Sequence, residues 1–186
     1  MPGVVAVLDA DVLVPILSCD LLLSAFDQDL YRPVVTTTIL EEVERNLIGD
    51  FPQFDVASLR SRVAQVAAAL SLHTHEQGHV VDASLENVNR KDRHVAATAL
   101  AYSADLVVTN DRRLRGEINA LGLSLRAVSG DDFALQLLRD QPDGVDTVIG
   151  LLVGKRTRRP VTRSQLLDQL VGLFPAFVSE LRRGQD

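Results

Sequence analysis

A chain of 186 residues with 46% hydrophobic and 24% charged residues has the composition of one ordinary folded domain, which excludes a disordered protein. Tryptophan is absent and aromatic residues make up only 4%, which argues against a surface that stacks nucleic-acid bases on aromatic rings. The formal net charge of −6 is uneven, because residues 154–186 carry a positive balance on an otherwise acidic chain. A polyanion therefore needs bound cations or this basic tail to approach the protein.

The cysteine content and the apolar runs indicate in which cellular compartment the protein is expected. Cys19 is the only cysteine, so the chain has no internal disulfide and a reducing, cytoplasmic setting is expected. No basic stretch followed by a long apolar one opens the chain, and no segment reaches the ~18 apolar residues of a membrane span. We therefore expect a cytoplasmic protein without a membrane partner.

Short apolar runs rich in β-branched residues have the pattern of buried strands. They cover residues 4–8, 33–37, 104–109 and 123–128. Helical patterns lie at residues 12–26, 38–48, 57–72 and 92–103. Strands that alternate with helices favour a parallel sheet covered on both faces. The sequence thus predicts a three-layer α/β/α sandwich around a parallel sheet of about four strands.

After the last predicted strand the pattern becomes helical. Short amphipathic stretches follow one another, separated by Pro142, Pro160 and Pro175. We expect an α/β domain over residues 1–140 and a C-terminal helical extension over residues 141–186, packed on that domain or linked to it.

Two acidic residues directly follow predicted strands. Asp9 ends the first run, and Asp111 follows the third run in LVVTND. An acid in this position commonly caps the next helix, so each alone favours a structural role. However, the carboxyl ends of parallel strands form one edge of the sheet, where ligands bind. The coincidence of the two acids at that edge favours a site.

Further carboxylates lie on predicted helices. In ILEEVERNL, periodicity places both Glu42 and Glu44 beside the buried stripe and does not choose between them. Glu41 points away from the stripe and follows Thr38 at the spacing of a capping box. Asp92 opens the helix DRHVAATALAY, where a carboxylate can cap the helix and bind a ligand at once.

Carboxylates that converge without cysteine or histidine ligands describe a site for Mg²⁺ or Mn²⁺. Such a cluster raises its own pKa values by mutual repulsion, and a bound cation removes that penalty. The cation would also draw phosphate into an acidic cleft and lower the pKa of a bound water.

The ordered set VLDADVL, ILEEVERNL, DRHVAATALAYSAD and LVVTND resembles the acidic quartet of PIN-domain nucleases. The resemblance covers residue 4 to about residue 140 and is strong to VapC-type toxins of toxin–antitoxin pairs, in the longer subgroup with a C-terminal helical extension. The tail RPVTRSQLLDQLVGLFPAF also looks like that extension. The ordered set is specific, whereas no single motif is.

This resemblance implies a PIN-like nuclease domain that hydrolyses RNA phosphodiester bonds with Mg²⁺ or Mn²⁺. It implies Asp9 and Asp92 as the principal metal ligands, with Glu42 and Asp111 completing the catalytic pocket, and it thereby selects Glu42 over Glu44. It further implies an RNA substrate, a small antitoxin partner and a homodimer.

Three residues take supporting roles by the same resemblance. Thr109 would orient a ligand or water from the strand end, and His94, just after Asp92, would position its neighbours. Asp11 stands where the family usually has asparagine, so its extra charge either tightens metal binding or caps the following helix.

Two polar stretches carry open alternatives. In HTHEQGH, the residues His73, His75 and His79 with Glu76 have spacing that can bind zinc, but an exposed loop is the favoured interpretation. In GKRTRRPVTR, the basic residues are either an RNA-contacting arm or a solvated linker docked on the acidic body. These basic residues are Lys155, Arg156, Arg158, Arg159 and Arg163.

Two other functions compete with the nuclease. In a haloacid-dehalogenase-like phosphatase, Asp9 would be the nucleophile and Asp11 the general acid. The remaining motifs would then be Thr36 or Thr37, Lys91 and Asp131–Asp132. That interpretation leaves the other acids without a role. The second competitor is a non-catalytic PIN-like module that holds RNA or a protein.

Overall fold

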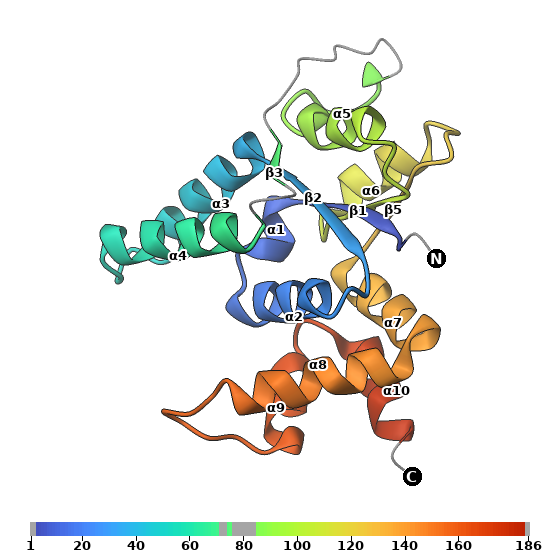
Figure 1. The fold of residues 1–186 in the computed structure, drawn as a ribbon. Helices are drawn as coiled ribbons and strands as arrows, with labels where there is room; N and C mark the ends of the chain where they lie inside the picture. The colour runs from blue at the N-terminus through green and yellow to red at the C-terminus, as the bar shows by residue number, and fades with distance from the viewer. Residues whose placement is uncertain (1–2, 71–73, 76–84, 185–186) are drawn as a thin grey trace.

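The computed structural model describes residues 3–70, 74–75 and 85–184. Within them, parallel strands form one sheet in the order β3-β2-β1-β4-β5 (Figure 1). The strands are β1 (Val5–Leu8), β2 (Arg32–Thr36), β3 (Thr74–His75), β4 (Leu106–Val108) and β5 (Arg126–Val128). β1 is central, with β2 and β4 paired on its two sides. The predicted parallel sheet is confirmed, with one strand more than the expected four.

The additional strand β3 lies in the stretch HTHEQGH, for which a loop was predicted. Thr74 and His75 pair with the last residues of β2 at the edge of the sheet. The loop prediction is therefore wrong for these two residues, because an edge strand needs only backbone partners and no apolar run. His73, Glu76 and His79 lie outside the described residues.

Helices cover both faces of the sheet, as the predicted three-layer sandwich requires. They are α1 (Ala10–Leu13), α2 (Ile16–Asp27), α3 (Thr37–Asp50), α4 (Val56–Ala69), α5 (Arg93–Ala101), α6 (Arg112–Asn119), α7 (Gly130–Asp140), α8 (Pro142–Gly154), α9 (Arg163–Leu170) and α10 (Pro175–Arg183). Figure 1 shows α5 and α6 on one side of the sheet and α2 and α7 on the other. The last three helices form a further layer beyond α2 and α7.

The predicted helix over residues 12–26 is two helices. Pro15 breaks it, because proline lacks an N–H donor and here adopts an extended conformation with ψ 125°. The Arg62 guanidinium, from α4, donates to the carbonyls of Leu13 (3.3 Å) and Val14 (3.0 Å) at the break. This arginine therefore satisfies acceptors that a helix end leaves without partners.

Two other helices, α6 and α3, differ from what the sequence indicated. The sequence did not predict α6, since only two of its residues are apolar and buried. The capping box of Thr38 with Glu41 is wrong, because β2 already ends at Thr36 and the helix begins one residue later. The Thr36 hydroxyl accepts the N–H of Ile39 at 3.3 Å instead.

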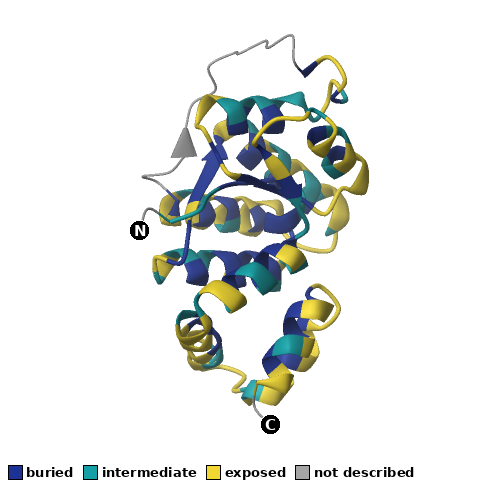
Figure 2. Cartoon of the chain, turned by 90° about the vertical axis from the view of Figure 1, so that its right-hand side faces the viewer, coloured by how far each residue is buried: buried dark blue, intermediate teal, exposed yellow. Residues whose placement is uncertain are grey.

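One buried apolar cluster runs through the sheet and the C-terminal helices (Figure 2). Tyr31 and Phe133 meet edge to face with ring centroids 5.0 Å apart. The Tyr31 hydroxyl donates to the carbonyl of Leu22 on α2, which satisfies its one polar group in the core. Cys19 is buried with a free thiol. No helix in the described part of the chain is long and apolar enough to cross a membrane.

Specific contacts hold the C-terminal helices against the α/β part. The Asp131 carboxylate, on α7, accepts the N–H groups of Ala176 (3.0 Å) and Phe177 (2.9 Å) at the start of α10. The Gln141 side chain donates to the carbonyl of Leu30 at 2.9 Å. α8 packs along α2. The division of the chain at residues 140 and 141 stays a prediction.

Candidate active site

Asp9 stands at the carboxyl end of the central strand, where β1 passes into α1. It is 8% exposed, and its carboxylate accepts the N–H of Ala10 and the hydroxyl of Thr109, each at 2.7 Å. Thr109 is fully buried and follows β4, which runs parallel beside β1. Residues distant in sequence therefore meet because two neighbouring parallel strands end together.

Asp11 lies in the first turn of α1 but does not cap it, since Asp9 occupies the capping position. Its two carboxylate oxygens accept the N–H of Asn110 at 2.8 and 3.1 Å, and one of them lies 3.2 Å from the Thr109 hydroxyl. Of the two roles considered for Asp11, helix capping is therefore wrong. The side chain instead fixes the loop that leaves β4.

The electrostatics of the cluster centre on Asp9. Its pKa is raised from 3.8 to about 7, first by burial and then by the negative charges of Asp11 and Glu42. The hydrogen bonds from Thr109 and Ala10 oppose the rise. Burial also raises the pKa of Asp11. The charged state of this acid pair is thus costly without a cation nearby.

Glu42 faces His94 across the gap between α3 and α5. The Oε2 atom of Glu42 lies 3.4 Å from Nε2 of His94, while Nδ1 of His94 lies 2.9 Å from the carbonyl of Lys91. A carbonyl only accepts, so Nδ1 carries a proton and donates it to Lys91, and Nε2 is the ring nitrogen that faces Glu42. This buried Nε2 has no hydrogen-bond partner. Glu44 is paired elsewhere, with Arg60 at 2.9 Å.

Asp92 and Asp111 both contact Arg113, the first through its guanidinium and the second through its backbone N–H. Asp111 caps α6, accepting the N–H groups of Arg113 (2.7 Å) and Leu114 (3.1 Å). Asp92 precedes α5 without capping it, and its carboxylate pairs with the Arg113 guanidinium at 3.1 Å. The capping role considered for Asp92 is therefore wrong, whereas Asp111 has one. The Asp111 N–H also donates to the Thr109 hydroxyl at 3.2 Å, which ties this pair to the Asp9 cluster.

The donor set has the chemistry of a site for a hard divalent cation. All its candidate ligands are carboxylates, and a cation that binds the charged form of Asp9 offsets the repulsion that raises its pKa. As the side chains stand, no group of three acidic, histidine or cysteine residues in the described ranges is arranged to hold a metal. Asp92 in particular would have to exchange Arg113 for the ion.

Two residues of the site were missed from the sequence. Arg113 pairs with Asp92 and also lies 3.3 Å from Glu117 on its own helix. Asn110 uses its side-chain oxygen to accept the N–H of Gly130 at 3.1 Å, which joins the β4 loop to α7. Both follow Thr109 in TNDRRL, but only their three-dimensional partners reveal these roles.

Residues that the competing phosphatase would use make other contacts in the structure. Thr36 caps α3, and Asp131 is occupied at the start of α10. Asp132 accepts the Ser129 hydroxyl at 2.6 Å at the start of α7. These residues have structural roles at separate helix ends, which argues against that chemistry.

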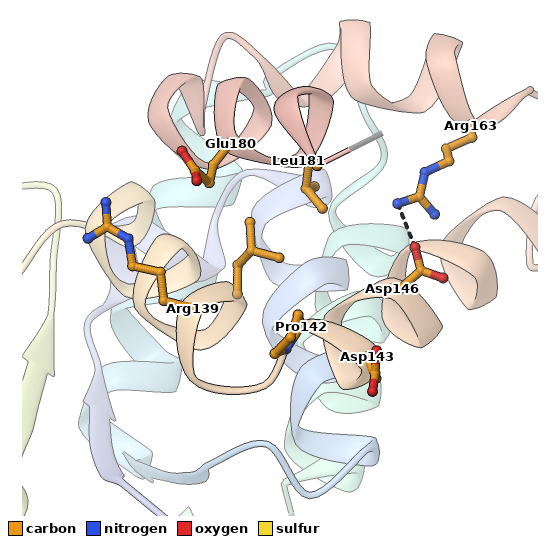
Figure 3. Close-up of a pocket in the computed structure, with 9 residues that line it drawn as sticks. Arg139, Pro142, Asp143, Asp146, Arg163, Glu180 and Leu181 are labelled. Atoms are coloured by element: carbon orange, nitrogen blue, oxygen red, sulfur yellow. Dashed lines mark ion pairs between the residues drawn. The ribbon is translucent and has the colours of Figure 1, made fainter. Parts of the chain in front are cut away.

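A pocket of about 410 Å³ opens between the C-terminal helices (Figure 3). Its lining includes Arg139, Asp143 and Glu180, and its Arg163 and Asp146 form an ion pair of 2.7 Å. It gathers none of the predicted catalytic acids, so the carboxylate cluster stays the candidate active site.

Residues 5–113 match the family described as PIN domain. The VapC50 protein of Mycobacterium tuberculosis (strain ATCC 25618 / H37Rv), which is named as a ribonuclease, is 31% identical over 97 residues. The match covers 52% of this chain and 57% of that protein, so the chain spans little more than half the length of this relative. No solved structure matches.

Proposed function

The chain belongs to the PIN-domain family, and from that premise we propose that it is a metal-dependent endoribonuclease, the toxin of a VapBC-type toxin–antitoxin pair. The observation that carries the proposal is the environment of Asp9. This acid is buried at the end of the central strand, and the charges of Asp11 and Glu42 help to raise its pKa to about 7. A cluster of this kind is suited to a cation and, through it, to a phosphodiester.

In this proposal the acids of the matched region hold Mg²⁺ or Mn²⁺. Asp9 and Asp92 would be its principal ligands, with Glu42 and Asp111 completing the pocket directly or through water. When bound, the ion supplies Lewis acidity to the phosphate and a lowered pKa to a coordinated water. Thr109 fixes the orientation of Asp9 through its 2.7 Å hydrogen bond.

Around the same site, Asp11 holds Asn110 and therefore the strand end in place. His94, with Nδ1 fixed on the Lys91 carbonyl, positions Glu42. Both act by keeping the acids pre-organised for the ion and the substrate.

The partners of the protein belong to the same proposal. The relative named as a ribonuclease supports RNA as the substrate, and its VapC name supports a small antitoxin as the protein partner. We also propose a homodimer, which light scattering of the purified protein tests directly. A cytoplasmic setting fits the single buried cysteine, whose thiol is free.

Cleavage of structured RNA in Mn²⁺ tests the activity, using wild type, Asp9→Asn and the control Asp140→Asn. Asp140 is exposed at the end of α7, outside the cluster. We expect the control to cleave like wild type and Asp9→Asn to lose at least about a hundredfold, because the central ligand is neutral. A chelator should stop wild-type cleavage and added Mn²⁺ should restore it.

The competing functions are distinguished when phosphomonoester turnover and RNA binding are measured on the same proteins. Turnover of a phosphomonoester through a phosphorylated Asp9, without RNA cleavage, would show the phosphatase. RNA binding without turnover of either substrate would show the non-catalytic module. For the toxin role, induced wild type should arrest bacterial growth and Asp9→Asn should not.

A further inference from the structure

The segment that joins α8 to α9 carries a cluster of positive charges on an acidic protein. Residues 155–162 contain Lys155, Arg156, Arg158 and Arg159, while the whole chain has a formal net charge of −6. Arg158 and Arg159 are exposed, and within the described residues neither forms an ion pair or side-chain hydrogen bond. Two adjacent cations without acidic partners are available to an anionic ligand.

The other cations of this region are placed along α2. The Lys155 ammonium lies 3.0 Å from the Ser24 hydroxyl and 3.9 Å from the Asp27 carboxylate. Arg156 donates to the side chain of Gln169 on α9 at 2.7 Å. These contacts fix the base of the segment against the body and leave its tip projecting, on the same side as α4 in Figure 1.

Arg62, on α4, connects this region with the candidate active site. Burial raises the pKa of Asp20, on α2, and the positive charges of Arg62, Lys155 and Arg156 oppose the rise. The three cations therefore lie around one acid. Arg62 in turn donates to the carbonyls of Leu13 and Val14, at the end of the short helix that begins beside Asp9.

We propose that Arg62, Lys155, Arg156, Arg158 and Arg159 form a basic ridge that binds the phosphate backbone of the RNA next to the cleavage site. The inference rests on the proposed ribonuclease function. A phosphodiester held at the acids has further phosphates on the same strand, and the acidic cluster itself repels them. Cations that extend from the end of α1 along α2 neutralise those phosphates and align the strand.

The chemistry favours backbone contact over base recognition. The ridge contains no aromatic residue, and only 4% of the chain is aromatic, so stacking does not supply the affinity. Guanidinium and ammonium groups bind phosphate oxygens irrespective of the base. The ridge therefore sets affinity and the minimum length of the RNA, and the affinity depends strongly on salt.

Equilibrium binding of a fluorescent single-stranded RNA tests the ridge in the full-length Asp9→Asn protein, which does not consume the probe. Arg158→Gln with Arg159→Gln removes the two unpaired cations at the exposed tip. The matched control, Arg182→Gln with Arg183→Gln, removes the same charge from α10, where these arginines pair with Asp168 and Glu180. Affinity is measured over a series of KCl concentrations, with a long and a very short RNA.

We expect the tip variant to bind the long RNA roughly tenfold more weakly and to lower the salt slope by about 1.4, since each lost single-strand phosphate contact removes about 0.7. The α10 control should match the parent, and the short RNA should not distinguish the two. Equal affinities and slopes for tip variant, control and parent overturn the ridge while leaving cleavage, and thus the proposed function, intact.

Two further outcomes also count against the ridge. If the tip variant keeps its RNA affinity but loses an acidic protein partner, the segment is a protein-docking site. If neither the parent nor any variant binds RNA and wild type cuts none, both the ridge and the proposed function fail. Circular dichroism of each variant shows whether the fold is retained.

Discussion

The hydroxyl of Thr109 donates a 2.7 Å hydrogen bond to the carboxylate of Asp9, 100 residues earlier in the chain. The same oxygen lies 3.2 Å from the Asp11 carboxylate and accepts the N–H of Asp111 at 3.2 Å. A hydroxyl has one proton to donate, so it serves one acid of the pair at a time. The hydroxyl therefore does not offset the negative charge of the other acid, and a cation that approaches the cluster can do so.

Stability should depend on pH through Asp9. Its pKa is about 7 in the folded protein and 3.8 without the fold, so the folded state binds the extra proton in this interval. The resulting stability is present below pH 3.8 and is lost as the pH rises through about 7. In a chelator, the melting temperature of wild type minus that of Asp9→Asn should therefore fall across this window.

A divalent cation should reverse that loss at the upper end of the window, because it binds only the charged form. The matching measurement is a thermal scan at neutral pH with and without Mn²⁺, and Asp9→Asn should respond much less than wild type. A pH-independent difference between the two proteins would contradict the assigned environment of Asp9.

Asp11→Asn should preserve most of the cleavage that Asp9→Asn abolishes. The amide oxygen of asparagine can still accept the N–H of Asn110, as the carboxylate does at 2.8 Å. Removing the negative charge of Asp11 should also lower the pKa of Asp9. We expect cleavage within a few-fold of wild type, with the acidic limb of its pH profile moved to lower pH. Equal damage from both substitutions would instead favour the two-acid phosphatase chemistry.

Arg113→Gln should strengthen metal binding. The guanidinium now pairs with Asp92 at 3.1 Å, so it competes with a cation for that carboxylate. Because the arginine side chain is 58% exposed, the ion pair contributes only about 0–1 kcal/mol to stability. We expect a few-fold gain in Mn²⁺ affinity by calorimetry and an unchanged melting temperature.

The neighbouring Arg112→Gln is the control for that experiment. Arg112 is exposed, and its replacement removes the same charge one residue away. It separates release of Asp92 from a general loss of positive charge, which would affect both variants alike. A fall in Mn²⁺ affinity for Arg113→Gln would show that the arginine supports the site.

Two glycines on α8 should respond oppositely to alanine. A Cβ on Gly144 would lie 2.5 Å from Cδ2 of the buried Leu30, so Gly144→Ala should destabilise the protein by about 1–3 kcal/mol. Nothing lies within 4 Å of a Cβ on Gly150, so Gly150→Ala should stabilise it by about 0.5–1 kcal/mol through helix propensity. Urea unfolding measures both, and the same sign for both would contradict the packing of α8 on this part of the core.

The main strands were predictable because their apolar runs, such as VVAVL, report burial on both faces. Because parallel strands end at the same edge of a sheet, the predicted strands also placed Asp9 and Asp111 at one sheet edge. Periodicity failed where apolar residues are few, as in α6, and where an edge strand needs only backbone partners, as in β3. It also gave no means to see that Asp92 turns to Arg113, because a side-chain partner leaves no periodic signal.

The layer formed by the last three helices affects how the protein would behave if shortened. α8 and α10 cover an apolar surface of α2 and α7 that includes Leu21, Leu22 and Leu137, all buried in the full chain. A chain ending at residue 140 would expose this surface to water as one contiguous patch. We expect it to self-associate, which sedimentation against the full chain would reveal. The helical layer would then act as a solubility determinant for the part that carries the acids.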